Sequence, residues 1–194
     1  MSYVLNHPCV IRMTSSKELI DELLPRFEYG NRYSIDIPCG IERVASAVET
    51  YRLDDSFVVR LLFRLRGLQP PGPLRSHLVG RGFTVLAESP GRQVVVGIAG
   101  RFWALNQQAG LIPVQDAREF IAYAKPGTAK CAATIVMEPL SDTRTRLTTE
   151  TRVLCCDRAA RREFAAYWVL IRPMSAWIRR ILLRGVREKA LATA

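Results

Sequence analysis

The stretch that decides the fold is LTTETRVLCCDRAARREFAAYWVLI, residues 147–171. Up to Cys155 it alternates between small or apolar residues and charged ones, which is the period-two pattern of a strand. Asp157, a residue type that favours helix N-caps, then begins a helical pattern that continues to about residue 189. A strand that leads directly into one long terminal helix is therefore the starting point for interpreting the rest of the chain.

Shorter alternating segments precede that strand. They are separated by turn sequences such as PGR at residues 90–92 and KPGT at residues 125–128, which are typical of antiparallel strands joined by short connections. The predicted strands cover residues 83–89, 93–99, 118–124, 129–139 and 145–156, and residues 101–116 have room for another short one.

The N-terminal half combines a strand with helices. A strand is predicted over residues 32–38, and helices over 41–51 and 54–67 are followed by a proline- and glycine-rich loop over 68–82. Strand, helices, a run of antiparallel strands and a final helix predict an α+β protein in which the C-terminal helix covers one face of the sheet.

The first thirty residues form a predicted extension. SSKELIDELL, residues 15–24, predicts a short helix with Ser15 and Glu18 at the spacing of a capping box. We expect residues 1–30 to precede a single domain over residues 31–194. The N-terminus lacks the pattern of a signal peptide, and the most apolar run, from Phe164, ends after eight residues at Arg172. We therefore expect a cytoplasmic protein.

The composition is basic, and it narrows the partners without selecting one. The net charge is +10, with 24 arginines and 4 lysines, which favours anionic partners such as phospholipid headgroups, acidic small molecules or nucleic acid. The sequence contains no pattern of a DNA- or RNA-binding module, so nucleic acid is the least favoured of these. The five cysteines have no CxxC spacing, and we expect reduced thiols, no metal site and no cofactor.

The order of elements resembles the START-like, or SRPBCC, superfamily, which includes Bet v 1-type and polyketide cyclase/dehydrase-like proteins. The segments that carry this resemblance, to a bacterial branch, are GRFW (100–103), EFIAYAKPGTAK (119–130) and TTETRVLCCDRAARREFAAYWVLIRPMSAWIRRILL (148–183). The resemblance covers about residues 31–190. It implies a helix-grip fold, in which a curved antiparallel sheet wraps a long C-terminal helix and leaves an apolar cavity between them.

Alternation assigns a face to each side chain of the last strand. Residues Leu147, Thr149, Thr151, Val153 and Cys155 should face the helix, and residues Arg146, Thr148, Glu150 and Arg152 should face solvent. In the preceding strand, Lys130, Thr134 and Glu138 are expected to mark the exposed side. Cys155 and Cys156 should point to opposite faces. As a surface ion pair, Glu150 and Arg152 would contribute roughly 0–1 kcal/mol, or they would form a proton-transfer site if their face turned inward.

The terminal helix carries two apolar stripes and a row of arginines. The stripes are Phe164, Trp168, Ile171, Ser175, Ile178 and Leu182, and Tyr167, Leu170, Met174, Trp177 and Ile181. The arginines predicted to face solvent are Arg161, Arg162, Arg172, Arg179, Arg180, Arg184 and Arg187. The aromatic residues are interpreted either as ordinary core or as the wall of a ligand cavity.

Three functions remain open. The first is binding of a small, mainly apolar molecule, lipid- or polyketide-like and possibly acidic, in a pocket formed by Trp103, Thr149, Thr151, Tyr167, Trp168 and Ile171. The second is a cyclase- or dehydrase-like reaction on such a ligand, with Glu150, Arg152 and Tyr167 as weak catalytic candidates. The third is an interaction surface formed by the arginine row, for which a membrane surface is one possible partner. Arg66, Arg75, His77 and Arg81 in the predicted loop could form a cationic gate.

Overall fold

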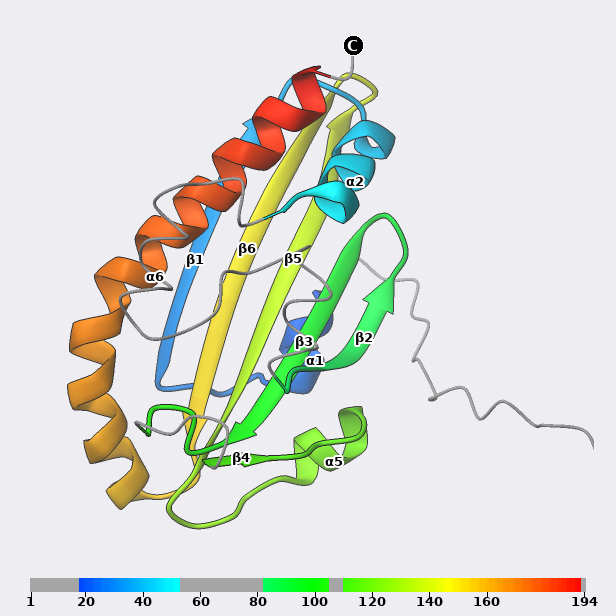
Figure 1. Ribbon diagram of the computed structural model, residues 1–194. Coiled ribbons are helices and arrows are strands. Elements are labelled where there is room, and N and C mark those ends of the chain that lie inside the picture. Colours follow the sequence, from blue (N-terminus) through cyan, green and yellow to red (C-terminus); the bar gives the residue numbers. More distant parts are fainter. Residues whose placement is uncertain (1–17, 53–81, 105–109, 193–194) are drawn as a thin grey trace, which may run out of the picture.

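The computed structural model describes residues 18–52, 82–104 and 110–192. Several predictions concern residues outside these ranges. They are the helix over 54–67, the loop over 68–82 (of which only residue 82 is described) with its cationic gate, Ser15 of the capping box, and Cys9. Within them the chain is an α+β protein with a curved, unclosed antiparallel sheet of six strands and one long C-terminal helix (Figure 1). The predicted fold class is confirmed.

The sheet has the strand order β1-β6-β5-β3-β2, and β4 pairs with β3. All pairings are antiparallel. The strands are β1 (Tyr29–Ile37), β2 (Thr84–Ser89), β3 (Gln93–Gly100), β4 (Leu111–Ile112), β5 (Ala129–Ser141) and β6 (Arg144–Cys155). The two longest, β5 and β6, form the central hairpin from which α6 continues.

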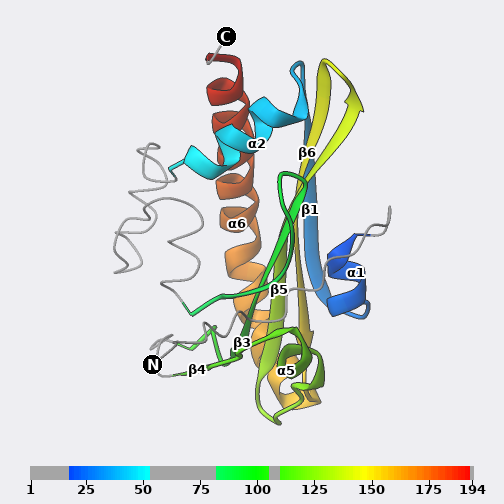
Figure 2. The same ribbon diagram turned by 90° about the vertical axis from the view of Figure 1, so that its right-hand side faces the viewer.

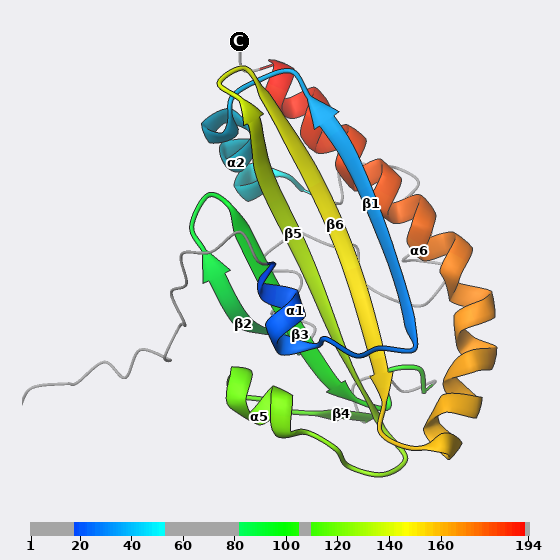
Figure 3. The same cartoon turned by 180° about the vertical axis from the view of Figure 1, so that it is seen from behind.

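Helices cover both faces of the sheet. One face, here called the α6 face, carries α6 (Arg158–Ala192) and α2 (Ile41–Thr50). The other, here called the α1 face, carries α1 (Leu19–Leu23) and α5 (Ala117–Ala122). Figures 2 and 3 show α1 and α6 on opposite sides of the strands. On the α1 face, the helices contact β2, β3 and β5, whereas Arg32 and Ser34 of the edge strand β1 are exposed.

The strand predicted over residues 118–124 is wrong, because residues 117–122 form the helix α5. The Asp116 side chain accepts a hydrogen bond from the Glu119 backbone N–H at 2.9 Å and caps the helix. Phe120 is fully buried under the sheet. Lys130 then donates to the carbonyls of Phe120 and Ile121 at 3.1 and 2.7 Å, at the C-terminal end of the helix, where Phe120 O also accepts the Tyr123 backbone N–H at 3.3 Å. Lys130 is thus buried, contrary to its predicted exposure.

Candidate functional site between α6 and the sheet

Helix α6 is buried at its two ends but not in its middle. Its buried residues are Ala160, Phe164, Leu182, Leu183, Val186 and Ala190. No residue of the intervening span, 165–181, is buried, although Ile171, Ser175 and Ile178 on its inner side are partly covered. The helix is therefore fixed to the sheet at both ends, with a looser span between them.

An aromatic cluster closes the end of this span where α6 begins. Phe164 is 1% exposed. Its ring centroid lies 5.0–5.9 Å from those of five neighbours, Tyr29, Phe102, Trp103, Tyr167 and Trp168. Trp103 also donates from Nε1 to Glu163 at 3.2 Å. Three of the predicted pocket residues, Trp103, Tyr167 and Trp168, thus belong to one cluster around Phe164. Each of the three is itself only half-buried.

The two predicted pocket threonines, Thr149 and Thr151, lie on β6 opposite a later part of α6, where an arginine of the helix contacts them. Arg179 donates from Nη1 to Thr149 Oγ1 at 2.5 Å and from Nη2 to Thr151 Oγ1. Arg179 therefore points toward the sheet, and its predicted place on the solvent side is wrong. Sequence spacing contains the signal for this. Position 179 precedes the buried residues Leu182 and Val186 by three and seven positions, so it lies on their stripe.

Asn31 adds a second polar side chain at this level. It is paired with Thr151 across β1 and β6, so its side chain shares the α6 face. Within the described residues, three buried side-chain nitrogen and oxygen atoms have no hydrogen-bond partner, namely Asn31 Nδ2, Asn31 Oδ1 and Arg179 Nε. All three belong to this place, between the aromatic cluster and the apolar contacts at the far end of α6.

The charge of Arg179 has no carboxylate partner among the described residues. Arg179 keeps partial exposure as a residue, but its Nε is enclosed. Burial lowers the pKa of Arg179, and the weaker electrostatic effects of Cys131, Tyr33 and the more distant Glu150 carboxylate oppose this. Arg179 stays protonated even so, because the guanidinium of arginine does not lose its proton in proteins. The site thus holds a cation whose hydrogen-bond partners here are neutral hydroxyl groups.

Glu150 and Arg152 lie on the α1 face, away from Tyr167. The prediction that they are exposed is wrong, because α1 covers them and their side chains are only 7% and 9% exposed. Arg152 contacts Glu150 at 2.6 Å and Asp21 of α1 at 2.8 Å, and Glu150 also pairs with Arg32 at 2.9 Å. Burial alone would lower the pKa of Arg152, but its carboxylate partners raise it. These residues form an ion-pair network that attaches α1 to the sheet.

The two adjacent cysteines point to opposite faces, as predicted. Cys155 is buried in the cluster of Phe164, whereas the thiol of Cys156 lies 3.7 Å from the Thr128 hydroxyl. Burial raises the pKa of Cys155 and that of Cys131 to about 12. Both groups are therefore thiols at neutral pH, which agrees with a packing role.

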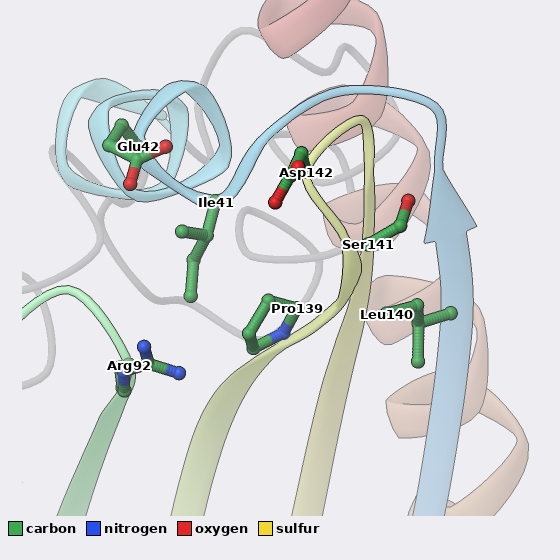
Figure 4. A pocket seen from close by; sticks show the side chains of 7 residues that line it. All are labelled: Ile41, Glu42, Arg92, Pro139, Leu140, Ser141 and Asp142. Atoms are coloured by element: carbon green, nitrogen blue, oxygen red, sulfur yellow. The ribbon is translucent and has the colours of Figure 1, made fainter.

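A separate surface pocket of about 510 Å³ lies at the opposite end of the sheet (Figure 4). It is open and sits between the start of α2, the β2–β3 turn and the β5–β6 turn. Its lining residues are Ile41, Glu42, Arg92, Pro139, Leu140, Ser141 and Asp142. None of the predicted site residues is among them.

Comparisons with known proteins give likeness of overall structure only. No protein-family model and no curated protein matches the chain. The chain is similar to a conserved protein from Geobacillus kaustophilus, with a TM-score of 0.43, 13% identity and coverage of 84% of this chain and 95% of that one. It is also similar to a hypothetical protein from Helicobacter pylori, with a TM-score of 0.42, 7% identity and coverage of 94% and 99%. At these values, neither likeness says what the chain binds.

In the described part of the chain, no helix combines the length and the apolar character that crossing a bilayer needs.

Proposed function

We propose that this protein binds a small, mainly apolar molecule between the middle of α6 and the sheet, as a member of the START-like superfamily that its sequence resembles. The observation that supports this most is the span 165–181, in which no side chain is buried although both ends of the helix are. A helix that served only to cover the sheet would bury its inner stripe along its whole length.

The side chains around this span suit an apolar ligand. Thr149, Thr151 and Ala133 are small and lie side by side on the α6 face, because Ala133 pairs with Thr151 across β5 and β6. Trp168 and Ile171 are partly buried on α6, nearer to the aromatic cluster than Arg179 is. Small residues on the sheet and large apolar ones on the helix suit an apolar ligand with few polar groups to orient it.

The proposal is tested with a neutral ligand. Native mass spectrometry of the purified protein should show a retained adduct, and the neutral dye Nile red should bind with a blue-shifted emission. Ser175→Trp places an indole on the inner side of the span and should abolish dye binding. Ala166→Trp is the matched control, because residue 166 is exposed on the same helix. Equal dye binding by the two variants, or no binding by the wild-type protein, would contradict the proposal.

We propose binding in preference to catalysis. A cyclase- or dehydrase-like reaction needs an acid–base group beside the ligand. Of the three candidates, Glu150 and Arg152 lie on the α1 face in an ion-pair network, and only Tyr167 lies on the helix side.

A second function, docking on an anionic membrane surface, is favoured by the outer side of α6. Val169 and Leu170 are each 77% exposed and Trp177 is 50% exposed. Exposed arginines surround them, among them Arg172 and Arg180, and α6 carries only two acidic residues. An apolar strip with a tryptophan, flanked by cations, matches the acyl boundary and phosphate groups of an anionic bilayer. A second copy of this chain is a less suitable partner for this strip, because the arginines of the two copies would face and repel each other.

Vesicle sedimentation tests this second function. The protein should sediment with phosphatidylglycerol vesicles much more than with phosphatidylcholine vesicles, and less so as salt is added. Leu170→Gln should weaken sedimentation, whereas Ile121→Gln, which changes a 50% exposed residue on α5, should not. Equal sedimentation by the two variants would refute the membrane surface. A dimer that dissociates only in Leu170→Gln would show a second copy on the strip instead.

A further inference from the structure

We infer that the molecule bound under α6 carries an acid group, a carboxylate or a phosphate, and that Arg179 and Asn31 bind this group. The inference rests on the proposed function, since it names the chemistry of the ligand in the same space. It adds a polar subsite beside Thr149 and Thr151, formed by two residues that are not among the predicted pocket residues.

The first step is the unneutralised charge. Burying a cation is costly unless an opposite charge or enough hydrogen bonds compensate it. Arg152, on the other face, has two carboxylate partners at 2.6 and 2.8 Å. Arg179 has only the hydroxyls of Thr149 and Thr151, which carry no charge, and its Nε donates to nothing among the described residues. An acid group of a ligand is the partner that a guanidinium with free donors binds most strongly.

The second step is the amide of Asn31. Both of its polar atoms are enclosed and lack a partner within the described residues. Leaving such an atom unsatisfied destabilises the folded protein. Asn31 Nδ2 is a donor for a ligand oxygen, and Asn31 Oδ1 is an acceptor for a hydroxyl or a water molecule beside it. A carboxylate or phosphate with its bound water satisfies both atoms, whereas an alkyl chain satisfies neither.

The third step is the common position of these groups. Asn31 is paired with Thr151, which accepts from Arg179, and directly opposed residues have Cβ atoms about 4.5–5.5 Å apart. Tyr33 is paired with Thr149, the other acceptor of Arg179. The unsatisfied atoms therefore belong to one place, formed by adjacent strands and the helix that crosses them.

The surroundings assign a direction to the ligand. Beyond Arg179 the helix packs closely, with Leu182 and Val186 buried against Leu147 and Ile37. On the other side lies the looser span, which ends at the half-buried Trp168 of the aromatic cluster. An acid group at Arg179 thus places the apolar chain along Ile171 toward the aromatic end.

The test compares ligands that differ only in the head group. Dodecanoate, dodecyl phosphate and dodecanol are each used to displace Nile red from the wild-type protein. We expect the better of the two acids to displace the dye at a concentration at least about tenfold lower than the alcohol requires. The acid that displaces more strongly identifies the head group. Arg179→Met should remove the preference and keep dye binding. Arg184→Met, which changes an exposed arginine of the same helix, should leave the preference intact, and Asn31→Ala should reduce it.

The outcomes separate this inference from the proposed function. If the dye binds but acids and alcohol compete equally in the wild-type protein, the acid-group inference fails and apolar binding stands. If the dye does not bind the wild-type protein, the proposed function fails. Should Arg179→Met fold poorly, Arg179→Lys replaces it: a retained but weaker preference for acids supports the inference, and an unchanged one overturns the role of the guanidinium.

Discussion

Replacing Arg152 by methionine tests whether α1 is held to the sheet by a buried ion-pair network. In the structure this arginine contacts Glu150 at 2.6 Å, Asp21 at 2.8 Å and the Leu24 carbonyl at 3.2 Å. Its guanidinium also lies 4.9 Å from the centre of the Phe27 ring. Methionine replaces the aliphatic stem of the arginine but not its guanidinium, so the change removes the charge, its hydrogen bonds and its contact with that ring.

The expected loss of stability follows from the burial of the two partners. Removing one member of a buried ion pair costs about 3–5 kcal/mol, because the other charge is left without compensation. In this network Glu150 keeps Arg32 at 2.9 Å, and Asp21 is 42% exposed and can be hydrated. We therefore expect a loss below that range, about 2–3 kcal/mol. For a chain of this size, that corresponds to a fall in Tm of roughly 4–12 °C.

Urea unfolding followed by circular dichroism measures this loss. Arg101→Met is the matched control, because Arg101 pairs with Glu163 at 2.7 Å while both side chains are about half exposed, and it should cost less than about 1 kcal/mol. The double variant Glu150→Gln with Arg152→Met should lose less than the sum of the single losses. Equal losses for Arg152→Met and Arg101→Met would refute a buried network and restore the interpretation as a surface pair.

Three further predictions concern the α6 face. Phe164→Ala should destabilise the protein by about 3–5 kcal/mol in urea unfolding, because five rings pack on that side chain; a loss below 1 kcal/mol would contradict this. Backbone N–H groups, that of Ala160 foremost, lower the pKa of Asp157. Its stabilisation is therefore present above the ordinary aspartate pKa of about 3.9 and is lost as pH falls through the lower folded pKa, so Asp157→Asn should show a flatter loss of stability in acid. Burial raises the pKa of Cys131 and Cys155 to about 12, so peptide mapping at pH 8 should find both labelled by iodoacetamide far more slowly in the native than in the urea-unfolded protein.

The main strands and α6 could be predicted because each carries its own periodicity. The predicted strands over 129–139 and 145–156 correspond to β5 and β6 within two residues at each end. Helix α5 was missed because REFIAYA contains the aromatic and β-branched residues that favour strands. The contrary signal was present, since Asp116 and Glu119 have the spacing of a capping box, and in the structure each of their side chains accepts a backbone N–H.

The exposed side of the sheet could not be assigned from alternation alone. Alternation separates the two faces of β6 correctly, but it does not tell whether a second layer covers the charged one. Glu150 and Lys130 are buried because α1 and α5 lie over that face, and both helices are short segments outside the run of long elements. Glu150 is satisfied by Arg152, two residues away, and by Arg32 of β1, and Lys130 by carbonyls of α5. Strand alternation predicts neither the covering helices nor the contacts of Lys130.

Arg179 is the residue for which helix spacing, rather than residue type, gives the right orientation. Arg179 and Arg180 are about 100° apart around the helix axis, so both cannot share the solvent side equally. Spacing from Leu182 places Arg179 inward, where an apolar residue would pack without an unpaired Nε. A buried charge contributes little to stability even when it is paired, and less when it is not. The chemistry of position 179 is therefore better explained by an anion that it binds than by the packing that it provides, which supports an acid group on the proposed ligand.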